Sequence, residues 1–240
     1  MKKFIAREAR ERFEAREWVE LISNSRTFRT QDQTIFNHDD LPMVKNELSM
    51  TLWLKLQSYP SDWATIFHKG TEHYVRTPGL WLTAGKSKLH GRFSGNWNSN
   101  VGVWAAGDEF ALHKWYHIAY TLSDLEKRLD VYIDGEWVGH FPFLVENVQS
   151  QKVTFNNGPL YIGKAFTIGF DGEISNVRYF NWRLSVEEVR MDIHVIVILV
   201  SSTSIVILAS TSIVILASTS IVILVNTSIV RLDCKQNISY

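Results

Sequence analysis

Glu173 lies in the stretch of this sequence that comes closest to the paired carboxylates of a glycosidase. A retaining glycosidase needs two carboxyl groups about 5–5.5 Å apart, one acting as the acid and one as the nucleophile. Alternate residues of a strand point to one face, and Ser175 occupies the position at which a partner carboxylate would follow Glu173. One carboxylate cannot serve both roles. We therefore expect no glycosidase activity and interpret Glu173 as a solvated strand residue.

Eight histidines raise the question of a metal site. His113 and His117 are four residues apart, which is ~13 Å along an extended strand and too far for one zinc ion. His68 and His73 flank a turn at Gly70 and could converge. The simpler interpretation is that these are separate histidines at strand ends.

Polar loops that carry tryptophan are the strongest binding signal. Indole rings stack on the apolar faces of sugar rings, and Asn and Asp side chains bond hydroxyl groups. Trp97 has a second interpretation, in which it plugs an end of the fold. The candidate ligand-binding residues are Asp62, Trp63, Trp97, Asn98, Asn100 and Trp104.

The elements that must position these loops are strands. Apolar residues alternate with polar ones over positions 48–56, 116–122 and 129–133, which predicts half-buried strands. Turn residues separate these runs, and Asp134-Gly135 predicts a tight type I′ hairpin. Ser185 and Glu188 form a capping box that starts a short helix. Residues 25–192 are therefore predicted to form an antiparallel β-sandwich.

Composition excludes several classes of protein. Lys plus Arg equals Asp plus Glu at 25 each, so no net charge attracts nucleic acid. Cys234 is the single cysteine, which excludes an internal disulfide and a multi-cysteine zinc site. Any partner must be recognised by a local surface.

The two ends of the chain differ from the middle. Residues 1–24 alternate acidic and basic groups at helical spacing and predict a charged amphipathic helix without the apolar stretch of a secretory signal. Residues 193–230 repeat STSIVILA, and 231–240 form a polar tail. The repeat is long enough to span a membrane, but it also has the composition of a low-complexity or cross-β segment. Both alternatives remain open, and a cytoplasmic or tail-anchored location is favoured over secretion.

The order of several motifs resembles the laminin G-like, concanavalin A-like lectin/glucanase superfamily. The motifs include LSMTLWLKL, SDWATIFHKG, GLWL, LHGRFS, KWYHIAYT, VYIDG and FDGEISNVRYFNWRLS. The resemblance implies a jelly-roll sandwich of two antiparallel sheets that binds carbohydrate or protein. It also implies a calcium ion at a loop edge, for which Asp39, Asp40 and Asp171 are the candidate ligands. The predicted sandwich lacks the cysteines that close many extracellular members, which favours a non-oxidising setting.

The sequence thus predicts an all-β, jelly-roll recognition module without catalytic activity, whose loops bind a glycan or a protein. Two alternatives remain: a hydrolase of the same fold with an unusual site, and a structural adhesion domain held at a membrane by residues 193–230.

Overall fold

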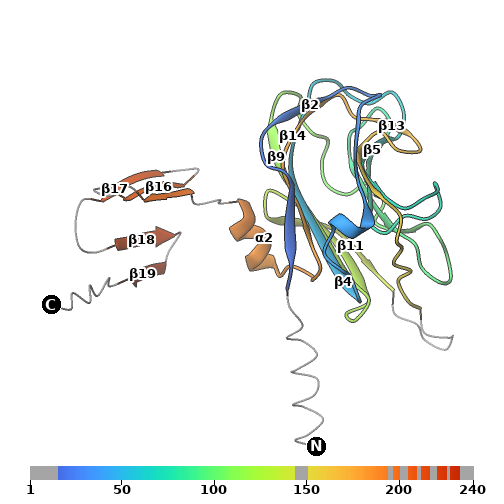
Figure 1. Ribbon diagram of the computed structural model, residues 1–240. Helices are drawn as coiled ribbons and strands as arrows, with labels where there is room; N and C mark the ends of the chain where they lie inside the picture. Colours follow the sequence, from blue (N-terminus) through green and yellow to red (C-terminus); the bar gives the residue numbers. More distant parts are fainter. Residues whose placement is uncertain are drawn as a thin grey trace, which may run out of the picture. The chain divides into compact units, whose positions relative to one another are not determined.

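The computed structural model describes residues 16–143 and 151–193, together with five strands in the segment beyond. The chain divides into two compact units, Met1–Arg190 and Met191–Tyr240. The first unit contains two sheets that face each other as separate layers, with β14 and β9 in one and β5 and β13 in the other (Figure 1).

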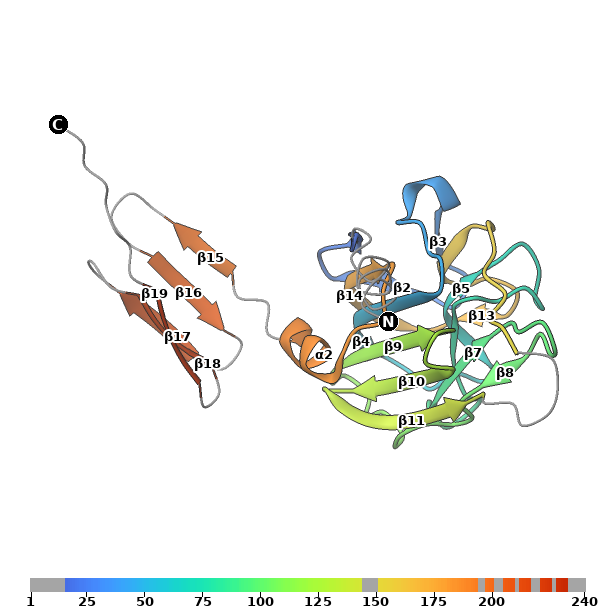
Figure 2. The same cartoon turned by 90° about the horizontal axis from the view of Figure 1, so that it is seen from below.

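Sheet A has the strand order β1-β14-β4-β9-β10-β11, with β2 paired to β14. Its strands are β1 (Trp18–Ile22), β2 (Arg26–Phe28), β4 (Glu47–Leu56), β9 (Trp115–Ser123), β10 (Arg128–Ile133), β11 (Glu136–Pro142) and β14 (Gly172–Phe180). Strands β9, β10 and β11 run side by side (Figure 2), and every pairing in this sheet is antiparallel.

Sheet B has the order β3-β12-β5-β6-β7-β8, with β13 paired to β5. Its strands are β3 (Gln33–Phe36), β5 (Ala64–Lys69), β6 (Gly79–Leu82), β7 (Leu89–Phe93), β8 (Val101–Gly102), β12 (Leu160–Gly163) and β13 (Ile168–Gly169). All its pairings are antiparallel except that of β13 with β5. The predicted antiparallel sandwich is confirmed.

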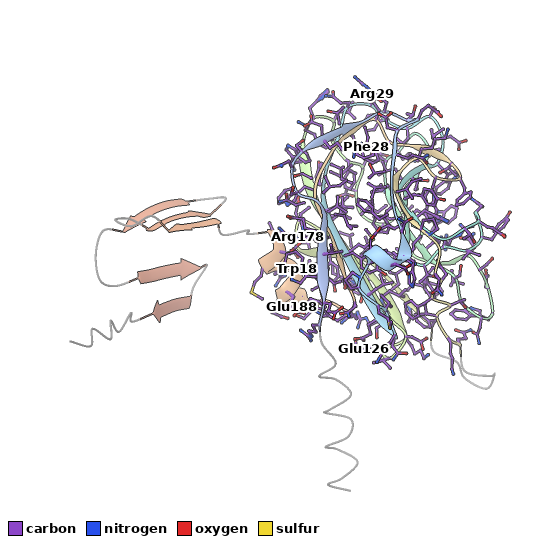
Figure 3. The ribbon with its side chains drawn as sticks, in the orientation of Figure 1. Trp18, Phe28, Arg29, Glu126, Arg178 and Glu188 are labelled. Carbon is purple, nitrogen blue, oxygen red and sulfur yellow. The ribbon has the colours of Figure 1, made fainter. Side chains whose placement is uncertain are left out.

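The core lies between the two sheets, and the predicted alternation correctly identifies the side chains of β4 that enter it. The strand is more buried than predicted, because Ser49 and Thr51 on its other face are also 0% exposed. Leu48, Leu52 and Leu54 are fully buried, whereas Trp53 between them is only partly buried. Phe28 points into the space between the layers (Figure 3), where its ring stacks on Phe170 with centroids 5.4 Å apart. Burial of these apolar side chains is the main force that holds the sheets together.

The Asp134-Gly135 turn is a tight hairpin, as predicted. Both residues have positive φ, 51° and 80°, and Ile133 pairs directly with Glu136 across the turn. The type I′ turn requires this conformation at both central positions, and Asp followed by Gly adopts it at little cost.

Helix α2 (Val186–Ile193) begins near the end of the first unit, and its predicted capping box is confirmed. The Ser185 amide donates to Glu188 Oε2 at 2.8 Å, and the Glu188 amide donates to Ser185 Oγ at 3.2 Å. A 3-10 turn, η1 (His38–Asp40), precedes β4. Trp18 and Arg178 lie close to α2, which carries Glu188 (Figure 3).

The helix predicted over residues 1–24 is wrong for its last part, because Trp18–Ile22 is strand β1. Val19 and Leu21 alternate with exposed residues and pack against the core, and Glu20 pairs with Arg178 of β14 at 3.3 Å. The alternation of apolar residues at the sheet edge therefore outweighs the helical charge spacing. The rest of that predicted helix, up to residue 15, lies outside the described residues.

The unit Met191–Tyr240 contains short antiparallel strands in two small sheets. Its strands are β15 (Val197–Val200), β16 (Ile205–Ala209), β17 (Ser212–Leu216), β18 (Ile221–Val225) and β19 (Ser228–Leu232). Within the part of the chain that the structure describes, no helix combines the length and hydropathy needed to cross a membrane.

Candidate binding site

The outer face of sheet B, which turns away from sheet A, carries an unusual set of side chains. Gly91, in the middle of β7, shows which residues of this strand face the core. A Cβ at Gly91 would lie 3.1 Å from the side chain of Val131 and 3.6 Å from that of Tyr120, both in sheet A. Gly91 therefore faces the core. Because side chains alternate along a strand, His90 and Arg92 point to the outer face.

Aromatic and basic side chains from neighbouring strands and loops extend this surface, which we call the arginine–aromatic face. It comprises His68, Trp81, His90, Arg92 and Tyr161 from the strands, and Trp63, Tyr74, Arg76, Trp104 and Phe166 from the loops. Trp81 and Tyr161 each lie between two inward-facing residues of their strands, which places them on the outside.

One end of this face is built from two tryptophans. The rings of Trp63 and Trp104 meet edge to face with centroids 5.4 Å apart, and each also contacts His90, at 4.6 and 4.7 Å. The Arg92 guanidinium lies 5.4 Å from the Trp104 ring. Trp104 nevertheless remains 67% exposed. It is thus a fixed ring that offers a large apolar surface to a ligand.

The centre of the face holds Arg76, which is only 4% exposed. Its guanidinium lies 5.4 Å from the Trp81 ring and 5.5 Å from the Tyr74 ring. Nη1 donates to Asn100 Oδ1 at 3.2 Å, and the backbone amide donates to Ser94 Oγ at 3.0 Å. Nε and Nη2 are buried without a hydrogen-bond partner among the described residues.

The charges of this face lack counter-charges. Neither Arg76 nor Arg92 has a carboxylate oxygen within 4.0 Å among the described residues. Burial lowers the pKa of Arg76, and burial together with the Arg76 charge lowers the pKa of Arg92 to about 10. Burial and both guanidinium groups lower the pKa of His90 to about 3, and burial and Arg76 lower the pKa of His68 to about 4. Both histidines are therefore neutral near pH 7.

The structure separates the predicted ligand-binding residues. Trp63 and Trp104 meet on the arginine–aromatic face, and Asn100 accepts a hydrogen bond from Arg76 at the centre of the same face. Asp62 accepts a hydrogen bond of 2.7 Å from the Trp63 amide, and Asn98 one of 2.8 Å from the Asn100 amide. Asp62 and Asn98 thus shape the two loops.

Of the two roles predicted for Trp97, ligand binding and packing, the structure shows the packing. Its ring stacks on Phe143 with centroids 5.6 Å apart and lies 6.0 Å from Phe93. The ring packs against the core cluster, so Trp97 closes an end of the sandwich.

The predicted calcium ligands do not come together. His38, next to Asp39 and Asp40, contacts Lys69 at one end of β5, whereas the strand just before Asp171 pairs with Ala64 at the other end, ~17 Å away. Asp171 accepts hydrogen bonds from Arg29 and Ser58. Among the described residues, no group of three or more His, Cys, Asp or Glu side chains could hold a metal ion. This donor set does not fit a calcium ion.

Glu173 and Ser175 lie on β14 of sheet A, away from the arginine–aromatic face. Lys55 Nζ contacts Glu173 Oε1 at 2.6 Å, and Ser25 Oγ donates to Glu173 Oε2 at 2.9 Å. These hydrogen bonds lower the pKa of Glu173. A general acid needs the opposite shift.

Sequence reasoning missed Arg76, Arg92, His90 and Trp81. The signal for two of them was present, because His90-Gly91-Arg92 places polar residues on both sides of a glycine within a strand. Arg76 gave no signal, since it lies in a loop and reaches the face only through the fold.

Together, the two facing sheets, antiparallel except for the pairing of β13 with β5, define a β-sandwich. The chain belongs to the concanavalin A-like lectin/glucanase superfamily, whose sequence pattern matches residues 28–190. No curated protein matches the chain.

Several solved structures are similar to this chain at low sequence identity. The binding domain of botulinum neurotoxin serotype D is 13% identical with a TM-score of 0.52, over 81% of this chain and 56% of that one. Domain 4 of the extracellular arabinanase AbnA from Geobacillus stearothermophilus, in complex with arabinotriose, is 16% identical with a TM-score of 0.49, over 75% and 81%. A Trypanosoma rangeli sialidase is 20% identical with a TM-score of 0.45, and the match spans 60% of this chain but only 22% of the sialidase.

Proposed function

We propose that this protein is a non-catalytic carbohydrate-binding module and that its ligand binds on the arginine–aromatic face of sheet B. The observation that carries the proposal is Trp104, a tryptophan that is 67% exposed although its ring is held by Trp63 and His90. Holding the ring in place in the free protein reduces the entropy lost on binding.

The chemistry around Trp104 suits a sugar. An indole ring offers an apolar surface to the C–H groups of a pyranose, and the Arg92 guanidinium beside it can donate to hydroxyl oxygens. Tyr74 and Phe166 are 64% and 43% exposed and extend the aromatic surface around Arg76 and His68. The face therefore has room for more than one sugar ring.

Several features support a binding role without catalysis. Glu173 is paired with Lys55, and Ser175 donates to the Ser23 carbonyl at 3.3 Å on the same sheet. The arginine–aromatic face is built from aromatic, histidine and arginine side chains, none of which supplies the carboxyl pair of a glycosidase. Incubation with β-glucans should release no new reducing ends. Turnover that Glu173→Gln abolishes would overturn this part of the proposal.

Binding is tested with the full chain on a glycan array, followed by calorimetry with the glycan that binds most tightly. The variant Trp104→Ala should weaken binding at least tenfold, because it removes the stacking surface. Trp18→Ala is the matched control, since Trp18 is 55% exposed but belongs to β1 of sheet A. Absence of any glycan binding, or equal loss in the two variants, would contradict the proposed function.

A further inference from the structure

Arg76 and Arg92 bring two positive charges together on one sheet face. In β6, Gly79 pairs directly with Arg92 of β7, and a Cβ at Gly79 would lie 3.5 Å from the Cβ of Arg76. The Trp81 ring, at 2.5 Å, fills the space that a side chain at position 79 would take, and Arg76 lies in van der Waals range of the same position, which is paired with Arg92. Arg76 and Arg92 are only 4% and 8% exposed. Burial and the charge of Arg76 together lower the pKa of Arg92.

Buried charges of the same sign are unfavourable unless an opposite charge or a full set of hydrogen bonds compensates them. Arg92 is partly compensated, because Nε donates to His90 Nε2 at 2.6 Å and Nη1 donates to the Gly102 carbonyl at 3.2 Å. Arg76 has only the bond from Nη1 to Asn100. Its Nε and Nη2 atoms, which lie on one edge of the guanidinium plane, have no partner in the described part of the chain.

The aromatic contacts of Arg76 do not replace these missing bonds. Trp81 and Tyr74 interact with the guanidinium through their ring faces, and such contacts compensate charge but do not accept the in-plane N–H groups. An acceptor with two oxygens in that plane would satisfy both.

Lys69 shows how the same fold satisfies a buried cation that has a structural role. Its ammonium group donates to the carbonyls of Asn156 and Gly158 at 2.6 and 2.9 Å and lies 3.2 Å from His38 Nδ1. These contacts join three segments of the chain. Arg76 has no such set of acceptors, although it is similarly buried.

We propose that the glycan bound by the arginine–aromatic face carries a carboxylate, and that the Nε–H and Nη2–H edge of Arg76 binds its two oxygens. A planar carboxylate matches this edge of a guanidinium as a bidentate pair. Arg92 supplies the second positive charge. This inference rests on the proposed function and adds the chemical class of the sugar, a sugar acid.

Entry of the carboxylate requires a local movement, because both nitrogen atoms are covered in the free protein. Of the two rings beside the guanidinium, Trp81 is only 4% exposed whereas Tyr74 is 64% exposed, so Tyr74 is the one that can move. Its side chain has solvent on its other side and can turn outwards without crossing the core.

The test compares each sugar acid with its own neutral derivative, so that only the charge differs. Calorimetry with the full chain uses oligosaccharides containing galacturonate, glucuronate, mannuronate or N-acetylneuraminate, each as the free acid and as the methyl ester. We expect at least one acid to bind tenfold or more tightly than its ester. A sulfated oligosaccharide of equal charge forms a separate arm, and tighter binding of the sulfate would overturn the assignment to a carboxylate.

Two variants assign the preference to Arg76. Arg76→Gln removes the charge, and Arg76→Lys keeps the charge but loses the paired N–H edge. Both should reduce the preference for acid over ester to less than threefold. Arg29→Gln is the control, because Arg29 is an exposed arginine that pairs with Asp171 away from this face. Each variant is first shown by circular dichroism to retain the strand signal of the parent.

The outcomes separate the two proposals. Equal binding of acids and esters would overturn the inference and leave the carbohydrate-binding function standing. A preference that persists in both Arg76 variants would also overturn it. Absence of binding to any acid, ester or neutral glycan would instead remove the proposed function.

Discussion

Arg92 Nε donates a hydrogen bond of 2.6 Å to His90 Nε2, two residues earlier on the same face of β7. The bond requires a lone pair on His90 Nε2, so the imidazole is neutral. Arg92 Nη2 also lies 3.5 Å from His90 Nδ1, but only one nitrogen of a neutral ring accepts, and the 2.6 Å contact identifies it as Nε2. An uncharged ring can lie between Arg92 and Trp104 without adding a further positive charge to the face.

The first prediction concerns pH. Burial and nearby arginines lower the pKa of His90 to about 3 and that of His68 to about 4. Since both stay neutral in the folded state while the unfolded chain takes up protons near pH ~6.5, the stability they contribute is complete above that pH. It is lost as pH falls towards the folded values, by at most about 1.4 kcal/mol per pH unit for each histidine.

Urea denaturation at pH 7, 6 and 5 measures this slope. His90→Gln should reduce it, because glutamine keeps an acceptor for Arg92 without titrating. His113→Asn is the control, since His113 is exposed and asparagine tolerates its positive φ of 62°. A free energy of unfolding that stays constant from pH 7 to 5 would show that these histidines are not buried as described.

The second prediction concerns Asp130, whose side chain is fully buried on sheet A. Its carboxylate accepts two hydrogen bonds of 2.7 Å from Arg128 and one of 2.8 Å from Arg183, and Trp137 Nε1 donates to it at 3.0 Å. Burial alone would raise the pKa of Asp130, but the hydrogen bonds from the two arginines lower it. The carboxylate therefore stays ionised and ties the segment before α2 to the sheet.

Asp130→Asn removes the buried counter-charge that the two arginines share, and leaves, within the described residues, only the longer contact of Arg183 with Glu126 at 3.4 Å. It should cost about 3–5 kcal/mol of unfolding free energy. Glu136→Gln breaks an exposed pair with Arg190 and should cost less than about 1 kcal/mol. Chemical denaturation of both variants at pH 7 compares them. Similar losses would mean that the Asp130 network contributes no more than a surface pair.

The third prediction concerns Gly79. A Cβ at this position would come within 2.5 Å of the Trp81 ring, so Gly79→Ala must displace the indole or the backbone. Because Arg76 lies against Trp81, we expect the displacement to weaken glycan binding at least tenfold. A crystal structure of the variant should show Trp81 in a new position. Unchanged glycan affinity would mean that the packing around Arg76 does not determine binding.

The fold could be predicted because strands leave a direct pattern in the sequence. Alternation over positions 48–56 reports which side chains of β4 face the core, and Asp134-Gly135 reports a local turn that needs no tertiary information. Strand β1 was missed because Glu20 and its charged neighbours also fit a helix, and only pairing with β14 decides between the two.

The site could be predicted only in part. Trp63 and Trp104 were identified from local composition, since each lies in a polar loop. Arg76 and Arg92 are brought together by the pairing of Gly79 with Arg92, and this strand register cannot be obtained from either segment alone. The predicted calcium ligands do not come together for the same reason. The sequence does not show that Asp39 and Asp171 lie at opposite ends of β5.

The last prediction separates the two tryptophans that sequence reasoning grouped as ligand contacts. Trp97 packs on Phe93 and Phe143, and its replacement should therefore affect folding. Trp97→Ala should cost about 3 kcal/mol, at the lower end of the range for large aromatic residues in a core. Trp104→Ala should cost only about 1 kcal/mol, the value of its aromatic contacts with Trp63 and His90.

Binding should show the reverse order. At a temperature where both variants are folded, Trp97→Ala should bind glycan within threefold of the parent, and Trp104→Ala at least tenfold more weakly. Thermal denaturation and calorimetry on the same samples measure both quantities. Because a ring that plugs the sandwich and a ring that faces solvent differ in what surrounds them, the two losses should not occur together. If Trp97→Ala instead abolished binding while leaving stability unchanged, Trp97 would be a ligand contact and its packing role would be wrong.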